Sequence, residues 1–225
     1  MKQKYLFFIK RFFYYFYGEK FFKRLNYDWS KYPSRTEIIQ SIIDEKKFND
    51  YLEIGCDKDE NFSKIKIPNK TGVDPLRGGT VRMTSDNYFS NNKNNLFDLI
   101  FLDGLHTYEQ TIKDIFNSLK TLKKNGVIIV HDCLPKKIWN QIVPRMYGHW
   151  NGDVWKAIVH SRTIQSVDTY TCLADHGLGF IFNRPNRNLL KIENKNFKKL
   201  RFSEYYKNHD EFMNLVNFRD LKKIF

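Results

Sequence analysis

The chain has 225 residues, of which 41% are hydrophobic, so it is long enough for one domain with a sizeable core and an appendage. Its formal net charge of +13 is carried by the two ends, because residues 1–25 hold seven Lys and Arg against one acid and residues 184–225 hold eleven against five. The three cysteines, Cys56, Cys133 and Cys172, show neither the close pairing of a disulfide framework nor zinc-site spacing, which favours a cytoplasmic protein.

Residues 1–30 form a basic and aromatic extension. Aromatic side chains crowd residues 5–17, but Lys10 and Arg11 interrupt the run. The apolar stretches are shorter than the roughly 20 residues that span a bilayer, and they lack the apolar core of a signal peptide. We therefore predict an amphipathic helix over residues 1–25 that packs on the domain, on a second subunit, or on a membrane surface. The last contact would make the protein peripheral to a membrane.

Strands and helices alternate along residues 31–185. The hydrophobic pattern predicts, in order, a helix from residue 36, strands at 51–55, 71–73, 81–83 and 97–102, a helix with Ile112 to Leu122 on one face that Asn125-Gly126 stops, and a strand at 127–130. After residue 135 it predicts a loop, a helix near 154–160, and two strand-like runs, at 164–172 and 178–183.

This order predicts a Rossmann-like, doubly wound α/β fold. Apolar strands that alternate with helices are typical of a parallel sheet that is covered on both faces. The turn at residues 175–177 joins the last two strand-like runs into an antiparallel hairpin at the sheet edge. We therefore expect a mostly parallel, seven-stranded sheet within residues 31–185, followed by a basic helical tail at 186–225.

Polar residues follow the strands, at the edge where open α/β sheets bind ligands. Glu53 and Gly55 end the first strand, and the later strands are followed in chain order by Asp74, Asp103, and His131 with Asp132. A single acid at such a place often only caps a helix or a turn. Several strand ends that carry such residues in order predict a binding site instead.

These residues resemble the class I methyltransferases that use S-adenosylmethionine. The resemblance covers roughly residues 35–183 and rests most on FDLIFLDGLHTYE at 97–109 and GVIIVHD at 126–132. These two runs resemble a subgroup of small O-methyltransferases that modify surface glycans or natural products, which would imply a role in polysaccharide biosynthesis. The resemblance implies S-adenosylmethionine as cofactor, with contacts from Glu53, Gly55, Asp74, Ser85, Asp86 and Asp103. Glu53 would lie near its amino end, Asp74 on the ribose, and Ser85 and Asp86 beside the adenine.

The first cofactor motif departs from the family pattern. Asp59 stands where the family usually has a second glycine. Asp tolerates the left-handed conformation better than most residues, so we expect the turn to be kept. Asp57, Asp59 and Glu60 also make this loop acidic, which would repel the pyrophosphate of a dinucleotide.

Methyl transfer to a hydroxyl needs a group that removes the proton. His106, His131 and Asp132 are the expected catalytic residues, with a neutral histidine as general base. Asp103 and Asp132 are also the expected ligands if a divalent cation such as Mg acidifies the hydroxyl instead. The predicted acceptor is a sugar or another small polar molecule, and His149, Trp150 and Trp155 would shape its pocket.

Two other functions stay open at this point. One is a non-catalytic Rossmann-like binding module that holds a polyanion through its basic tails. The other is an NAD-dependent oxidoreductase, against which the acidic loop argues. Nucleic acid is not an expected partner, because the chain lacks the Asn/Asp-Pro-Pro-aromatic tetrapeptide of amino-methylating enzymes.

Overall fold

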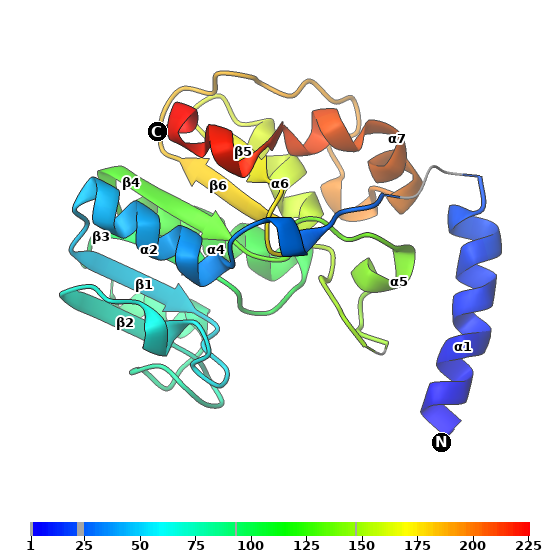
Figure 1. Ribbon diagram of the computed structural model, residues 1–225, viewed down its shortest axis with the longest axis horizontal. Coiled ribbons are helices and arrows are strands. Elements are labelled where there is room, and N and C mark those ends of the chain that lie inside the picture. Colours follow the sequence, from blue (N-terminus) through cyan, green and yellow to red (C-terminus); the bar gives the residue numbers. More distant parts are fainter. Residues whose placement is uncertain (1, 22–24, 93, 147) are drawn as a thin grey trace.

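A computed structural model describes residues 2–21, 25–92, 94–146 and 148–225 (Figure 1). Its strands are β1 Asp50–Ile54, β2 Asn69–Val73, β3 Phe97–Leu102, β4 Leu122–Val130, β5 Asp168–Cys172, β6 Leu178–Phe182 and β7 Leu215–Val216. Its α-helices are α1 Lys2–Tyr14, α2 Arg35–Lys46, α3 Ser85–Asn91, α4 Tyr108–Lys120, α5 Ile138–Gln141, α6 Trp155–Arg162 and α7 Phe202–Met213.

The strands form one seven-stranded sheet in the order β2-β1-β3-β4-β6-β5-β7. Strands β1 to β4 run parallel to one another, whereas β6 runs antiparallel to both β4 and β5. This confirms the predicted fold class, a mostly parallel sheet with an antiparallel hairpin near one edge. The strand order reverses between β1 and β3, and such a switch point opens a crevice at the carboxyl ends of the strands.

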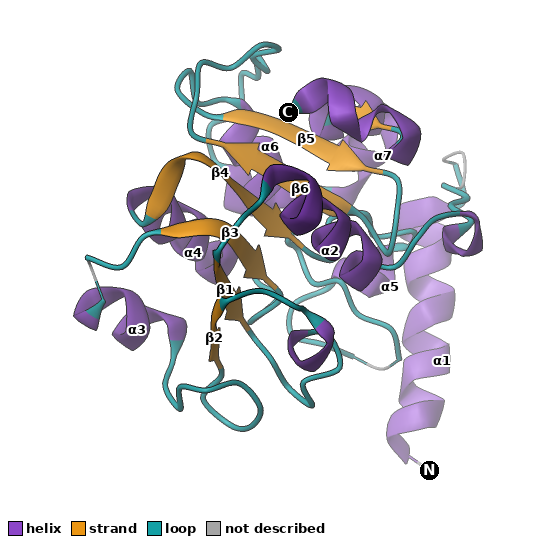
Figure 2. Ribbon diagram, turned by 60° about the vertical axis from the view of Figure 1, so that its left-hand side comes forward, coloured by secondary structure: helices purple, strands orange, loops and turns teal. Residues whose placement is uncertain are grey.

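Helices cover both faces of the sheet, as Figure 2 shows. On one face, alternate strand residues such as Leu52, Ile100 and Ile128 pack with side chains from α3, α4, α6 and α7. On the other face, neighbours such as Leu99 and Val127 pack with four isoleucines of α2 and with the C-terminal residues. Period-two alternation explains why consecutive apolar residues in one strand serve two separate cores.

Three sequence-based boundaries are wrong. The strand-like run predicted at 164–172 begins only at Asp168, as β5. Residues 81–83 form no strand, because Val81 makes only an isolated bridge to Val73, and β7 supplies the seventh strand instead. The Asn125-Gly126 pair does not stop a helix; α4 ends at Lys120 and the pair lies inside β4. A side chain at Gly126 would meet the carbonyl oxygen of Asp98 at 2.7 Å, so glycine there permits close strand pairing beside the register shift.

The two ends of the chain differ in how they join the domain. The N-terminal prediction is confirmed in part, since α1 continues into a π-helical turn at Tyr15–Glu19, and residues 1 and 22–24 lie outside the described residues. At the other end, β7 pairs with β5, and Phe202, Tyr205 and Met213 of α7 are buried in the core. The division of the chain at residue 185 stays a prediction. Among the described residues, no helix has the length and apolar character to cross a bilayer.

Candidate active site

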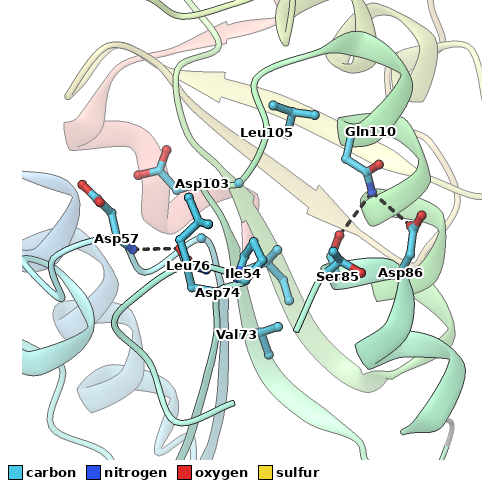
Figure 3. A pocket seen from close by; sticks show the side chains of 14 residues that line it. Ile54, Asp57, Val73, Asp74, Leu76, Ser85, Asp86, Asp103, Leu105 and Gln110 are labelled. Carbon is cyan, nitrogen blue, oxygen red and sulfur yellow. Dashed lines mark hydrogen bonds between the residues drawn. The ribbon is translucent and has the colours of Figure 1, made fainter. Parts of the chain in front are cut away.

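A cleft of about 460 Å³ opens at the carboxyl ends of β1, β2 and β3 (Figure 3). Five of the six predicted cofactor residues line it, and these are Gly55, Asp74, Ser85, Asp86 and Asp103. Apolar side chains, among them Ile54, Val73 and Leu76, supply the rest of its wall. A largely apolar cleft of this size with a few polar groups suits one small organic ligand.

Gly55 brings the ends of β1 and β3 together at the switch point. Its φ is +89°, which an L side chain rarely adopts, and a Cβ atom there would lie 2.3 Å from the carbonyl oxygen of Asp103. Only glycine therefore permits both the turn and the contact. The same absence of a side chain keeps this part of the cleft open to a ligand.

The turn after Gly55 keeps its shape without the second glycine of the family motif. Asp59 adopts φ +62°, the left-handed conformation that we expected it to tolerate. Its carboxylate Oδ1 accepts a hydrogen bond from the backbone N–H of Gly79 at 2.7 Å. This bond ties the turn to the loop after β2, so Asp59 supplies a tether that glycine could not.

Asp74 holds the loops around the cleft and still faces into it. Its Oδ1 accepts from the backbone N–H groups of Leu76 (2.8 Å) and Arg77 (3.0 Å), and its Oδ2 accepts from that of Asp57 (3.0 Å). Burial alone would raise the pKa of Asp74, but these bonds outweigh it and lower that pKa. A carboxylate has about four acceptor positions, so Asp74 keeps one for a ligand hydroxyl.

Ser85 and Asp86 begin α3 and are held by α4. The Gln110 amide nitrogen lies 3.1 Å from both Ser85 Oγ and Asp86 Oδ1, as the dashed lines of Figure 3 show. Lys113 pairs with the other oxygen of Asp86. The sequence predicted Ser85 and Asp86 but not Gln110, because α4 brings it to the cleft from 25 residues further along the chain.

Glu53 lies in an adjoining cavity of about 220 Å³. The two cavities share Gly55 and Asp103 in their walls. Glu53 is 1% exposed, and its Oε2 accepts hydrogen bonds from Tyr51 Oη (2.5 Å) and Asn61 Nδ2 (2.8 Å). Burial raises the pKa of Glu53 to about 7 despite these bonds. Asp57, Glu60 and Asp103 also line the smaller cavity, against the basic Arg35 and Lys58, so its wall holds more acids than bases and suits a cationic group of a ligand.

The predicted catalytic residues meet at the ends of β3 and β4. Asp103 Oδ1 lies 3.0 Å from His131 Nδ1 and 3.2 Å from His106 Nε2. On the other side, Asp132 Oδ2 lies 3.3 Å from His106 Nδ1. The structure therefore brings together the four side chains that the sequence placed on one wall, Asp103, His106, His131 and Asp132.

The two histidines differ in their access to a ligand. The side chain of His106 is 19% exposed and lines the smaller cavity, whereas that of His131 is only 5% exposed. Burial opposes the charged form of both rings, but the Asp103 and Asp132 carboxylates outweigh it and raise both histidine pKa values above the ordinary value. Burial would raise the pKa of Asp103, yet the positive charge of these rings lowers it.

Two further residues complete this cluster, and sequence reasoning missed both. Arg35, in the first turn of α2, places Nη1 3.3 Å from His131 Nε2 and Nη2 4.0 Å from Asp103 Oδ2. Asp175, in the turn between β5 and β6, accepts a hydrogen bond from the Arg35 backbone N–H at 2.7 Å. Arg35 begins a helix and Asp175 lies in a turn beyond the parallel strands β1 to β4, so the polar residues after those strands gave no signal for them.

The loop before α6 contributes to the site through Trp150 rather than Trp155. The Trp150 ring stacks on His106 at 5.4 Å between ring centres, and its carbonyl oxygen lies 3.2 Å from His106 Nδ1. Trp155 is fully buried against Tyr205, so it belongs to the core. His149 lies 3.9 Å from Asp132, at the same wall.

Two groups of side chains could hold a metal ion among the described residues. They are Asp103 with His131 and Asp132, and Asp132 with His149 and His176. Magnesium prefers about six oxygen ligands in an octahedral arrangement. Around Asp103 and Asp132, two imidazoles and the Arg35 guanidinium already neutralise the carboxylates. This donor set does not fit magnesium well.

The close approach at Gly55 gives a first testable prediction. Gly55→Ala should lower the free energy of unfolding by about 1–2 kcal/mol through left-handed strain and by about 1–3 kcal/mol more through the clash with Asp103. Gly148→Ala is the matched control, because Gly148 also has positive φ (+78°) but its Cβ would meet no atom within 4 Å. Denaturant unfolding of both variants measures the difference. Equal losses of unfolding free energy in the two variants would show that the close approach of Gly55 to Asp103 does not exclude a side chain.

Comparisons with known proteins agree with this geometry. Residues 37–133 match a family model described as a methyltransferase domain. No curated protein gives a significant sequence match. The structure resembles the SAH-bound Podospora anserina methyltransferase PaMTH1 (15% identity, 69% of this chain, 81% of that chain, TM-score 0.51). It also resembles cofactor-bound Rv0187 from MTB (11% identity, 74% of this chain, 85% of that chain, TM-score 0.51).

At these identities the structural likeness establishes the fold, and the family model adds the likeness of residues 37–133 to a methyltransferase domain. The match spans α2 through the end of β4, and it includes every strand end that lines the two cavities. Residues 37–133 thus match a methyltransferase domain, and the chain has the fold of the SAH-bound and cofactor-bound proteins that it resembles.

Proposed function

We propose that this chain is an S-adenosylmethionine-dependent methyltransferase that methylates a hydroxyl oxygen of a sugar or another small polar acceptor, with His106 as general base. When bound, S-adenosylmethionine supplies the methyl group. The observation that carries the proposal is the position of His106, which lines the cavity next to the cofactor cleft and lies between the carboxylates of Asp103 and Asp132. A base in that place is needed for an oxygen acceptor, whose proton must leave as the new bond forms.

Each cofactor residue would hold a different part of S-adenosylmethionine. Asp74 accepts from a ribose hydroxyl at its remaining acceptor position, and Ser85 and Asp86 border the adenine. Gly55 lets the backbone approach the ligand closely. Glu53 lies in the acidic cavity, where its carboxylate favours the positively charged amino end. The cleft fits this arrangement because its two cavities meet at Gly55.

The proton step follows from the contacts of His106. In the neutral form, Nδ1–H donates to the Trp150 carbonyl oxygen or to Asp132, and Nε2 is the basic atom. Nε2 lies 3.2 Å from Asp103 Oδ1, so the acceptor hydroxyl must take the place of this carboxylate beside Nε2 before the proton moves. Nε2 accepts the hydroxyl proton, and the ring becomes an imidazolium. Asp103 and Asp132 then stabilise the charge that forms. His131, which is more buried, holds Asp103 in position.

Magnesium at Asp103 and Asp132, whose donor set does not fit it well, would be the other means of acidifying the hydroxyl. The two mechanisms differ in their response to a chelator and to pH. With His106 as base, methyl transfer should survive EDTA and should rise with pH through a pKa above 6.5, because the base must be neutral. Loss of activity in EDTA that added Mg²⁺ restores, together with the same loss in Asp103→Asn, would replace the base with a metal.

A glycan acceptor and a cytoplasmic location belong to the same proposal. The Trp150 ring next to His106 supports a sugar or ring acceptor, because flat aromatic faces stack on such molecules. Three free, buried cysteines support a reducing compartment. A helix at the N-terminus that contacts a membrane or a second copy would place the enzyme near a glycan that is assembled at a membrane.

A further inference from the structure

Helix α1 joins the domain along one narrow side. Phe7 is 8% exposed, and the Arg11 guanidinium lies 4.4 Å from the centre of the Trp139 ring. At the end of the π-helical turn, Glu19 is buried and accepts hydrogen bonds from the Ile138 backbone N–H (2.6 Å) and from Tyr206 Oη (2.8 Å). Figure 1 shows α1 at one side of the molecule, apart from the sheet. The helix is thus anchored, and most of its surface faces outward.

The outward side of this helix is apolar. Positions 5, 9 and 12 of α1 recur at the spacing of a single helical face, positions 6, 8 and 13 flank it, and Phe16 follows in the π-helical turn. The exposed side chains are Tyr5 (71%), Leu6 (51%), Phe8 (53%), Ile9 (40%), Phe12 (61%), Phe13 (53%) and Phe16 (39%). They are seven of the thirteen exposed large hydrophobic side chains among the described residues. An apolar concentration of this kind marks an interaction surface.

The charges around this face are positive. Glu19 is the one acid in residues 1–25, and it is buried against the domain. Lys10 is exposed on α1 itself, and Lys20 lies 4.7 Å from the centre of the Phe16 ring. Aromatic rings bordered by Lys and Arg are the composition of helices that lie in the interface of a bilayer.

We propose that α1 and the π-helical turn after it dock this protein on an anionic lipid surface, with Tyr5, Ile9 and Phe12 of α1 and Phe16 of the turn entering the boundary between headgroups and acyl chains. A helix of 13 residues is about 20 Å long, so it lies flat in the interface. A second copy fits less well, because a two-fold interface would bring the same positive face against itself. An anionic surface complements both the apolar stripe and the lysines.

The proposal is tested by sedimentation with vesicles, without cofactor or acceptor, so it can fail independently of the proposed methyl transfer. Wild-type protein should bind vesicles of phosphatidylcholine and phosphatidylglycerol (7:3) at least tenfold better than pure phosphatidylcholine, and less in high salt. Phe12→Ser/Phe13→Ser should reduce the partition at least tenfold. Leu96→Ser is the matched control, because Leu96 is 50% exposed outside α1 and both cavities, and it should bind as wild type.

A second variant separates charge from apolar contact. Lys10→Glu/Lys20→Glu should lose the preference for anionic vesicles. All variants should keep the cofactor affinity of wild type, which shows that they fold. Wild-type binding by the Phe12→Ser/Phe13→Ser variant would overturn the proposal. So would a dimer in light scattering that this variant abolishes while neither protein binds vesicles, since the face would then belong to a second copy.

Discussion

His106→Ala should reduce kcat for methyl transfer by about 10²–10⁴ while leaving the dissociation constant of S-adenosylmethionine within about threefold of wild type. The reason is that His106 touches Asp103 and Asp132 but lines only the cavity beside the main cleft. Removal of its ring takes away the proton acceptor and leaves the residues proposed for ribose and adenine in place. Steady-state kinetics with calorimetry separates the two effects.

Two further variants serve as controls for His106→Ala: one changes the carboxylate of Asp132, and the other changes a different histidine, His160. Asp132→Asn removes a charge that raises the pKa of His106, so the rise of kcat with pH should move to lower pH. His160→Gln should leave kcat within a few fold, because His160 contacts Tyr108 and stacks on Phe197, away from the acids. Full turnover by His106→Ala without added metal would contradict both the base and the metal mechanism.

Asp74→Ala should weaken the binding of S-adenosylmethionine roughly 10- to 150-fold, which corresponds to about 1.5–3 kcal/mol for charge-assisted hydrogen bonds. The carboxylate is largely buried at the end of β2 and holds three backbone N–H groups while it faces the cleft. Its loss therefore removes both a proposed ribose contact and the loop geometry around it. Calorimetric titration measures the change.

Asp74→Asn distinguishes the two contributions. The amide keeps one oxygen that can accept from Leu76 and Arg77, but it has no negative charge. Its affinity should lie between those of wild type and Asp74→Ala. Asp220→Ala is the control, because Asp220 pairs with Lys223 on the surface. An unchanged dissociation constant in Asp74→Ala would remove Asp74 from the cofactor site.

Much of the site could be predicted because parallel strands end at one edge of the sheet. Apolar strands at 97–102 and 127–130 each end in polar residues, and this alone placed Asp103 beside His131. The fold class followed from the same alternation of strand and helix. Local patterns of this kind are read directly from the order of residues.

Other parts of the structure depend on contacts that the order of residues does not reveal. Arg35 reaches His131 from 96 residues earlier, and its charge has no pattern that would distinguish it from a solvated helix residue. The helix α3 at Ser85–Asn91 has only two buried side chains, Tyr88 and Phe89, too few for a clear period. The sequence made Gly126 resemble a helix stop. Its actual role, close pairing with Asp98 of the neighbouring strand, is a tertiary contact that the order of residues does not show.

The most direct test of hydroxyl methylation with His106 as base follows a ¹³C-labelled methyl group from S-adenosylmethionine to its acceptor. Wild-type protein is incubated with methyl-labelled S-adenosylmethionine and a set of glycosides and diols, and the products are read by carbon NMR. We expect an O-methyl resonance with wild-type protein and its loss with His106→Ala. An N-methyl or S-methyl product, or bound S-adenosylmethionine from which no label moves to any hydroxylated acceptor, would contradict this expectation.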